Sequence, residues 1–288
     1  MYHRASKEVV EIAIAAPGSA VPRVLGGPAG RRRTREGSVL DHCLADCRRW
    51  LDHQPYGHQL LLENPSARDL ESALSESRDY LLAERARGTW SGGGVSIQFS
   101  GHGACPTGAW SLRDAVVTAR DVMELLAPIG RVAGGKLGLE LMLDSCFSGA
   151  FFCELMLLET SAPIVARDMA IGALPSQEAW ELDELGHGAH TFAFLNRGNA
   201  HVNQEMLAEA VRRKDDAYVR LATQGFVPNP VTYLTEGDQT SFELVNGHLL
   251  EVEGAASFEV HGVSSAQQLA DLIERASQLP YSQTLQRE

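Results

Sequence analysis

The stretch Gly138-Leu-Glu-Leu-Met-Leu-Asp-Ser-Cys-Phe-Ser-Gly149 is a hydrophobic strand pattern that runs directly into a cysteine and a glycine. A second strand pattern, over residues 95–100, ends in the same way at Gly101-His102-Gly103. One crossover helix fits between them, so the two strands are expected to be parallel neighbours. Neighbouring parallel strands end at one edge of a sheet, which would bring His102 and Cys146 together. The sequence therefore predicts an α/β fold with a Cys/His site.

A cysteine and a histidine at one sheet edge can perform nucleophilic catalysis. A thiol attacks a carbonyl carbon as the thiolate, so it needs an imidazole to take its proton and return it to the leaving group. We expect Cys146 to be the nucleophile and His102 the general base and then acid. The backbone N–H groups of Gly103 and Cys146 are expected to form the oxyanion hole. The following helix is expected to lower the pKa of the thiol through its dipole.

The two motifs also resemble those of a known group of proteases. Ser-Gly-His102-Gly and Asp144-Ser-Cys146-Phe-Ser-Gly are similar to the His-Gly and Asp-x-Cys-x-Ser-Gly boxes of the caspase-like clan (clan CD) of cysteine peptidases, most of all its metacaspase and CHAT-type members. His102 lies 44 residues before Cys146, near the spacing of a caspase-type pair. The Gln-Ala-Cys signature of animal caspases is absent, so the resemblance does not imply cleavage after aspartate.

The resemblance spans about residues 9–244 and implies a caspase-like (caspase–hemoglobinase) three-layer αβα sandwich with a mostly parallel central sheet. This peptidase domain would take residues 1–245. Residues 246–288 would form a small C-terminal α+β appendage of unknown role, with a strand over 256–263 and a helix over 264–277. A crossover helix is expected over residues 118–126, with Pro128 and Gly130 stopping it.

The resemblance further implies hydrolysis of peptide bonds through a Cys146 thioester. Asp144 is similar to the acidic wall of metacaspase specificity pockets, so cleavage after Arg or Lys is expected. In the clan, the segment after the next strand builds much of the remaining pocket, here Ser176, Gln177, Glu178 and Trp180. The alternative for Asp144 is structural: a cap on the next helix, or an acceptor of backbone hydrogen bonds that shape the cysteine loop.

Other classes of function stay open beside the peptidase. The chain could be a catalytically silent caspase-like scaffold, or a module that binds a small signalling ligand. A cysteine amidase or acyltransferase would share the dyad. For the peptidase, the resemblance implies a regulated effector in cell death or defence, acting on a protein or peptide substrate. Its trigger would be an activating partner, a small ligand or self-cleavage.

Composition narrows the partners and the compartment. A net charge of −12 over 288 residues repels phosphate backbones, so no nucleic-acid partner is expected. No apolar run reaches the roughly 20 residues that span a bilayer, so no membrane association is expected either. Five cysteines without disulfide-type spacing favour the cytoplasm. Cys43 and Cys47 lack a second ligand pair and no calcium-type loop is evident, so neither metal nor cofactor is expected.

Overall fold

A computed structural model gives the structure of this chain. It describes residues 9–18, 40–53, 57–87, 93–133, 137–158, 164–173, 231–236, 239–244, 248–252 and 265–277, and, within the segment 175–191, residues 175–176, 178–179, 181–182, 186–188 and 190–191.

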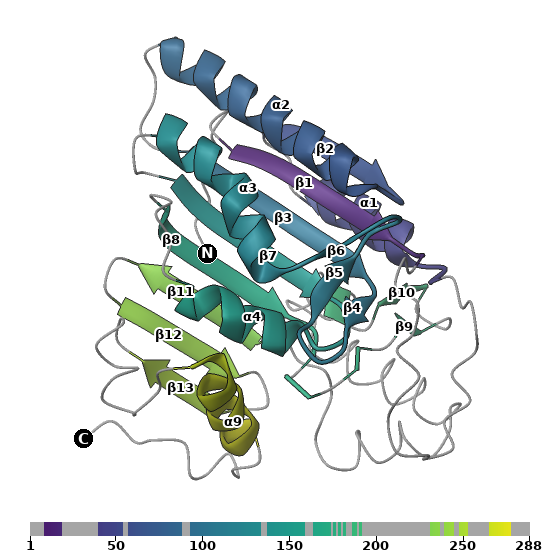
Figure 1. Cartoon of the computed structure of the whole chain (residues 1–288), viewed down its shortest axis with the longest axis vertical. Coiled ribbons are helices and arrows are strands. Elements are labelled where there is room, and N and C mark those ends of the chain that lie inside the picture. Colours follow the sequence, from purple (N-terminus) through teal and green to yellow (C-terminus); the bar gives the residue numbers. More distant parts are fainter. Residues whose placement is uncertain are drawn as a thin grey trace.

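An eight-stranded sheet forms the centre of the described part of the chain, in the order β13-β12-β11-β8-β7-β3-β1-β2 (Figure 1). The five strands from β2 to β8 are parallel, and the last three pair antiparallel at one edge. The predicted α/β fold with a mostly parallel central sheet is therefore confirmed. The strands are β1 (Val9–Ala16), β2 (His58–Glu63), β3 (Gly93–Gly101), β7 (Leu137–Asp144), β8 (Ile164–Ile171), β11 (Val231–Glu236), β12 (Gln239–Leu244) and β13 (His248–Val252).

Helices cover both faces of this sheet. One face carries α2 (Ala67–Ala86), α3 (Ala119–Val132), α4 (Ser148–Leu157) and α9 (Ala266–Ser277), and the other carries α1 (Cys43–His53) (Figure 1). Alternation along β1 explains the division, because side chains on a strand point to opposite faces in turn. Ile12 and Ile14 join the larger core with α2 and α3, whereas Ala13 and Ala15 join the smaller cluster with α1. The arrangement is compatible with a three-layer sandwich.

The strand order creates a natural place for a site. The chain moves from β1 outward to β2, then crosses to β3 on the other side of β1 and continues to β7 and β8. In open parallel sheets, ligands bind at the carboxyl ends of the strands near such a reversal. Short strands stand at this edge: β4 (Gly103–Ala104), β5 (Ala109–Ser111) and β6 (Val116–Val117) form one small sheet, and β9 (Glu181–Leu182) with β10 (His187–Gly188) forms another.

Helix α3 corrects one expectation, because it runs through Pro128 and ends at Val132. Proline lacks the N–H that would bond the carbonyl of Glu124, and a proline in a helix interior costs about 3 kcal/mol. Glu124 is exposed, so water can satisfy that carbonyl. Ile129 is buried in the core, and a side chain of this kind recovers about 1.5–3 kcal/mol on burial. The helix therefore continues because its last turn has apolar surface to bury.

The C-terminal elements belong to the same sheet and core. β13 pairs with β12 at the sheet edge, and α9 packs against α4. Leu269 and Ala270 of α9 are buried in the larger core with Phe151 and Leu155 of α4. The strand expected over residues 256–263 lies outside the described residues. None of the helices described is long and apolar enough to cross a membrane.

Candidate active site

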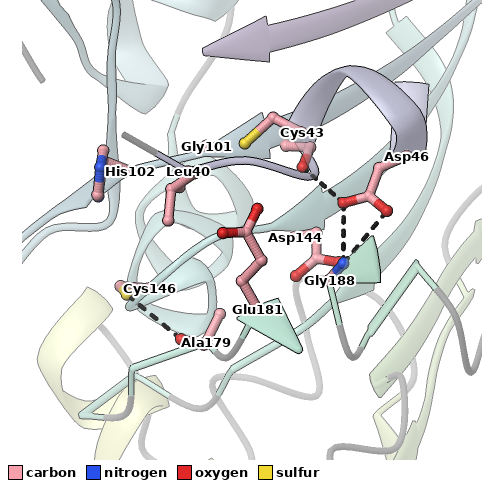
Figure 2. Close-up of a pocket in the computed structure, with 11 residues that line it drawn as sticks. Leu40, Cys43, Asp46, Gly101, His102, Asp144, Cys146, Ala179, Glu181 and Gly188 are labelled. Carbon is pink, nitrogen blue, oxygen red and sulfur yellow. Dashed lines mark hydrogen bonds between the residues drawn. The ribbon is translucent and has the colours of Figure 1, made fainter. Parts of the chain in front are cut away.

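Strand register brings the two motif residues to one pocket. Ser100 of β3 and Asp144 of β7 are direct partners in adjacent parallel strands. His102 follows Ser100 by two residues, and Cys146 follows Asp144 by two residues. Both therefore stand just beyond the same edge of the sheet. Both line a pocket with a volume of about 100 Å³ (Figure 2). That volume holds several water molecules or the polar head of a long side chain.

The remaining lining residues come from three parts of the chain. Helix α1 and Leu40, which precedes it, form one wall. The ends of β3 and β7 form another wall, and the segment that carries β9 and β10 closes the pocket. Figure 2 shows the dyad on one side, Asp46 and Asp144 on the other, and Glu181 between them. The full lining consists of Leu40, Cys43, Asp46, Ser100, Gly101, His102, Asp144, Cys146, Ala179, Glu181 and Gly188.

The small β4–β5–β6 sheet lies directly against the cysteine loop. A Cβ at Gly103 would overlap the carbonyl oxygen of Cys146, and it would lie 2.9 Å from that carbonyl carbon and 3.4 Å from the Cys146 nitrogen. A Cβ at Gly108, whose φ is +67°, would overlap the carbonyl oxygen of Phe147 in the same way. Only glycine permits these two approaches, which place the backbone of Gly103 against Cys146 and that of Gly108 against Phe147.

The Cys146 side chain is partly buried. Its thiol donates a hydrogen bond to the carbonyl of Ala179, with 3.8 Å between sulfur and oxygen. The pKa of Cys146 is raised to about 11, chiefly by burial; the contact with Ala179 opposes the rise, and the carboxylates of Glu178 and Asp144 add to it. The expectation of a lowered pKa is therefore wrong for this conformation. Helix α4 begins at Ser148, directly after Phe147, whose backbone is in the left-handed region. Burial of the sulfur outweighs the effect of the helix dipole on the pKa of the thiol.

Asp144 lies at the floor of the pocket and is buried. Its carboxylate accepts a hydrogen bond from the backbone N–H of Thr191 at 2.8 Å. The pKa of Asp144 is raised to about 7, first by burial and then by the neighbouring charge of Asp46, while the hydrogen bonds with Thr191 oppose the rise. A Cβ at Gly188 would overlap this carboxylate, so the backbone of β10 lies directly on it. Asp144 thus lines the pocket and also anchors the segment that covers it.

Asp46 brings a second buried carboxylate to the same floor. It accepts hydrogen bonds from the Ser100 hydroxyl at 3.0 Å and from the Gly188 N–H at 3.1 Å. His187 places its Nδ1 atom 2.8 Å from the other carboxylate oxygen. The carboxylate therefore ties together α1, the end of β3 and β10, and it gives the pocket a second acid beside Asp144.

Glu181 is the third acid of the pocket. Its carboxylate accepts hydrogen bonds from the backbone N–H groups of Asp41 at 3.1 Å and His42 at 2.6 Å. These N–H groups stand at the start of α1, where the first turn of a helix has unpaired donors and a positive dipole end. Burial raises the pKa of Glu181, while these two hydrogen bonds oppose the rise. Glu181 thus fastens β9 to the beginning of α1.

The residues named from sequence have different positions in the structure. His102, Cys146 and Asp144 meet at the pocket, and Gly103 lies against the cysteine loop. Ser176 and Glu178 are exposed, and neither is among the described residues that line the pocket. Gln177 and Trp180 lie outside the described residues.

Asp46 and Glu181 are the site residues that sequence reasoning missed. For Asp46 a signal was present, because Cys43, Asp46, Cys47 and Trp50 have the i, i+3, i+4, i+7 spacing of one helix face and all four are buried. A carboxylate within an apolar stripe must have buried partners. Glu181 offered no such pattern. Within the described part of the chain, no group of three His, Cys, Asp or Glu side chains could hold a metal ion.

No protein-family model matches the chain, and no curated protein matches it either.

Proposed function

We propose that this chain is a caspase-like cysteine endopeptidase that cleaves peptides after Arg or Lys. One observation carries the proposal: His102 and Cys146 stand beyond two registered parallel strands and line one pocket with three acidic side chains. The motif resemblance to metacaspase and CHAT-type peptidases adds the role of a regulated effector in cell death or defence. A cytoplasmic location fits the five cysteines, all of which are free thiols.

The chemistry would proceed through a thioester. His102 takes the proton of Cys146, and the sulfur attacks the carbonyl carbon of the scissile bond. The N–H groups of Gly103 and Cys146 bind the oxygen as it gains negative charge. The C–N bond breaks, and His102 gives its proton to the departing amine. His102 then takes a proton from water, whose hydroxide hydrolyses the thioester and restores the thiol.

The acidic floor supports selection of a basic side chain before the cut. Asp46 and Asp144 are buried carboxylates, and Glu181 is partly buried beside them. Charge-assisted hydrogen bonds to buried carboxylates are strong, and a guanidinium can bond two oxygens at once. A neutral side chain would add no charge-assisted hydrogen bond to these acids, and an acidic one would face repulsion. The pocket therefore favours Arg, then Lys.

A fluorogenic peptide library, varied at the residue before the cut, tests this function. Wild type and Cys146→Ala should be compared with and without calcium. Cleavage after Arg or Lys by wild type alone is the expected result. Strong preference for another residue would retain the peptidase and refute the acidic specificity pocket. Equal cleavage by Cys146→Ala would refute the nucleophile.

A catalytically silent scaffold is the second candidate, because one observation favours it. The Cys146 thiol has a raised pKa and donates a hydrogen bond to the Ala179 carbonyl, as a thiol with no catalytic role can do. Silence of wild type against the whole library, together with failure of Cys146 to react selectively with iodoacetamide, would favour that candidate. Turnover of small amides without peptide cleavage would favour an amidase or acyltransferase instead.

A further inference from the structure

The cysteine loop, residues 144–147, is attached at both ends to one short stretch of chain. Before the loop, the Leu143 carbonyl accepts a hydrogen bond from the Gly172 N–H at 2.8 Å. After the loop, the Ser148 hydroxyl lies 3.0 Å from the nitrogen of Ala173 and 3.2 Å from its oxygen. Gly172 and Ala173 are consecutive, so neighbouring residues just past the end of β8 hold the two ends of the loop together.

The Ser148 hydroxyl bonds both polar backbone groups of Ala173. It accepts from the Ala173 N–H and donates to the Ala173 carbonyl, because a hydroxyl has one proton and two lone pairs. The same carbonyl accepts from the Gly149 N–H at 2.9 Å, and so satisfies a first-turn donor of α4. Ser148 is 0% exposed, so water does not compete for these bonds. We call the two bonds of this hydroxyl the Ser148–Ala173 clamp.

The backbone of Phe147 explains why the loop needs a clamp. With φ 57° and ψ 21° it lies in the left-handed region, which a non-glycine residue adopts about ten times less readily than the right-handed one. Phe147 also stands at the N-cap of α4, and a phenyl ring cannot accept a hydrogen bond from the first turn. The residue next to Cys146 therefore does not stabilise its own conformation. The Ser148–Ala173 clamp acts on it from outside.

The Ser148–Ala173 clamp lies close enough to the nucleophile to affect catalysis. Cys146 precedes Ser148 by two residues, and its N–H is one of the two assigned to the oxyanion hole. We propose that Ser148 is a positioning residue, whose hydroxyl keeps Phe147 left-handed and so sets where the sulfur and N–H of Cys146 meet the substrate. Its effect on turnover rests on the proposed function, whereas its effect on the thiol can be measured without any substrate.

A mutant cycle between positions 147 and 148 tests this role, with kcat and KM for an arginine peptide as the readout. Ser148→Ala should lower kcat about 100-fold, the cost of a displacement of about 1 Å at a catalytic group. KM should stay within about threefold, because the Thr191 N–H still holds the Asp144 carboxylate. Beside Phe147→Gly the loss should be about tenfold smaller, since glycine adopts the left-handed region freely. Beside Phe147→Ala the loss should stay at about 100-fold, because alanine removes the ring and keeps the backbone preference.

The matched control is Ser77→Ala in α2. Ser77 is also 0% exposed, and its hydroxyl donates to the Ala73 carbonyl at 2.7 Å. Loss of this bond removes a buried serine hydroxyl without touching the cysteine loop, so kcat should stay close to that of wild type. Buried Cys153 reports unfolding in every variant through its protection from iodoacetamide, and exposed Cys105 is the reference inside each molecule.

A second measurement follows the Cys146 thiol in the absence of substrate. Iodoacetamide alkylation of each cysteine is timed by mass spectrometry of peptides. A displaced loop exposes the sulfur, and its pKa then falls from about 11 toward the ordinary 9.0. Cys146 of Ser148→Ala should therefore react up to about tenfold faster than in wild type, after allowance for the lower nucleophilicity of a more acidic thiol. Phe147→Gly in the same chain should return the rate toward that of wild type.

The possible results separate the clamp from the peptidase. A kcat of Ser148→Ala within about twofold of wild type would overturn the positioning role. An equal loss beside Phe147→Gly and Phe147→Ala would also refute it, because the hydroxyl would then not act through the left-handed residue. Labelling of Cys153 in Ser148→Ala would show a role in the fold as a whole and would exclude positioning. If wild type cleaves no peptide, the peptidase proposal fails, and the alkylation rate alone decides: faster Cys146 that Phe147→Gly reverses supports the clamp, and an unchanged rate refutes it.

Discussion

Gly103→Ala tests whether the close approach of two backbones builds the site. Any side chain at this position would place a Cβ within 2.9 Å of the Cys146 carbonyl carbon and nearer still to its oxygen. Real Cβ atoms essentially never come within 3.0 Å of a heavy atom of a residue that is not their own or a chain neighbour, and ordinary contact begins at 3.4 Å. The atoms in the way are backbone atoms, so no side-chain rotation can relieve the overlap. Either β4 or the cysteine loop must move.

The movement needed is about 1 Å, and a displacement of that size at a catalytic group can cost about 100-fold in rate. It would also pull apart the two N–H groups assigned to the oxyanion hole, and loss of one such donor costs about 2.7–4 kcal/mol. We therefore expect kcat against an arginine substrate to fall by about 10²–10³-fold. The free energy of unfolding should fall by about 1–3 kcal/mol, as for other overpacked positions.

The assay is steady-state hydrolysis of a fluorogenic arginine peptide, with urea unfolding of the same protein samples. Gly94→Ala is the matched control, because its Cβ would make only ordinary contacts, with the methyl groups of Val9 at 3.4 Å and 3.7 Å and with the carbonyl oxygen of Gly138 at 4.0 Å. It lies on β3, at the end away from the site. Gly94→Ala should keep nearly full activity. A Gly103→Ala enzyme that stays folded and turns over within about twofold of wild type would refute the backbone-contact argument.

Three further outcomes follow from the buried groups and from α3. Asp144 gains its charge as the pH rises through about 7, so KM for an arginine peptide should fall over that range in wild type. Asp144→Asn should raise KM by about 10–100-fold and remove this pH dependence, and an unchanged KM would contradict the role of Asp144. Glu11 is buried, and its pKa is raised from 4.5 to about 7. Between these two pH values the folded state holds a proton that the unfolded chain has lost, so the free energy of unfolding should fall as pH rises. Glu11→Gln should flatten that slope in urea titrations at several pH values, whereas equal slopes in both proteins would show that another group titrates. Pro128→Ala should raise the free energy of unfolding by about 1–3 kcal/mol in urea, because it restores a hydrogen bond to Glu124; no gain would mean that the helix has already accommodated the proline.

Local patterns in the sequence were enough to predict the centre of the sheet. The hydrophobic run before Cys146 and the run before His102 each predict a strand, and the crossover length predicts that the two strands are parallel neighbours. Both predictions are confirmed by the register of Ser100 with Asp144. The end of α3 could not be predicted in this way, because Pro128 stops a helix only when the residues beyond it have nothing to bury. That condition depends on Ile129 and the core around it.

The candidate site was likewise predictable only in part from local sequence. His102 and Cys146 are recognisable from their own neighbours in sequence, whereas Asp46 and Glu181 join the pocket through contacts across about 140 residues of chain. Charge and burial at Cys146 also depend on those distant segments. A helix N-terminus after the cysteine suggests a low pKa, but the sulfur is largely buried and lies near Glu178. Desolvation of the thiol depends on how the whole chain folds, so it cannot be predicted from the residues next to Cys146.

The packing of α9 on α4 has a consequence for the nascent chain during translation. Leu269 and Ala270 cover the helix that follows Cys146, yet ribosomes translate them more than a hundred codons later. At about 5–20 residues per second, that delay is on the order of ten seconds. During this interval α4, the helix that follows Cys146, is not yet covered by α9. Translation itself would thus delay the appearance of a fully assembled thiol site beside other nascent chains.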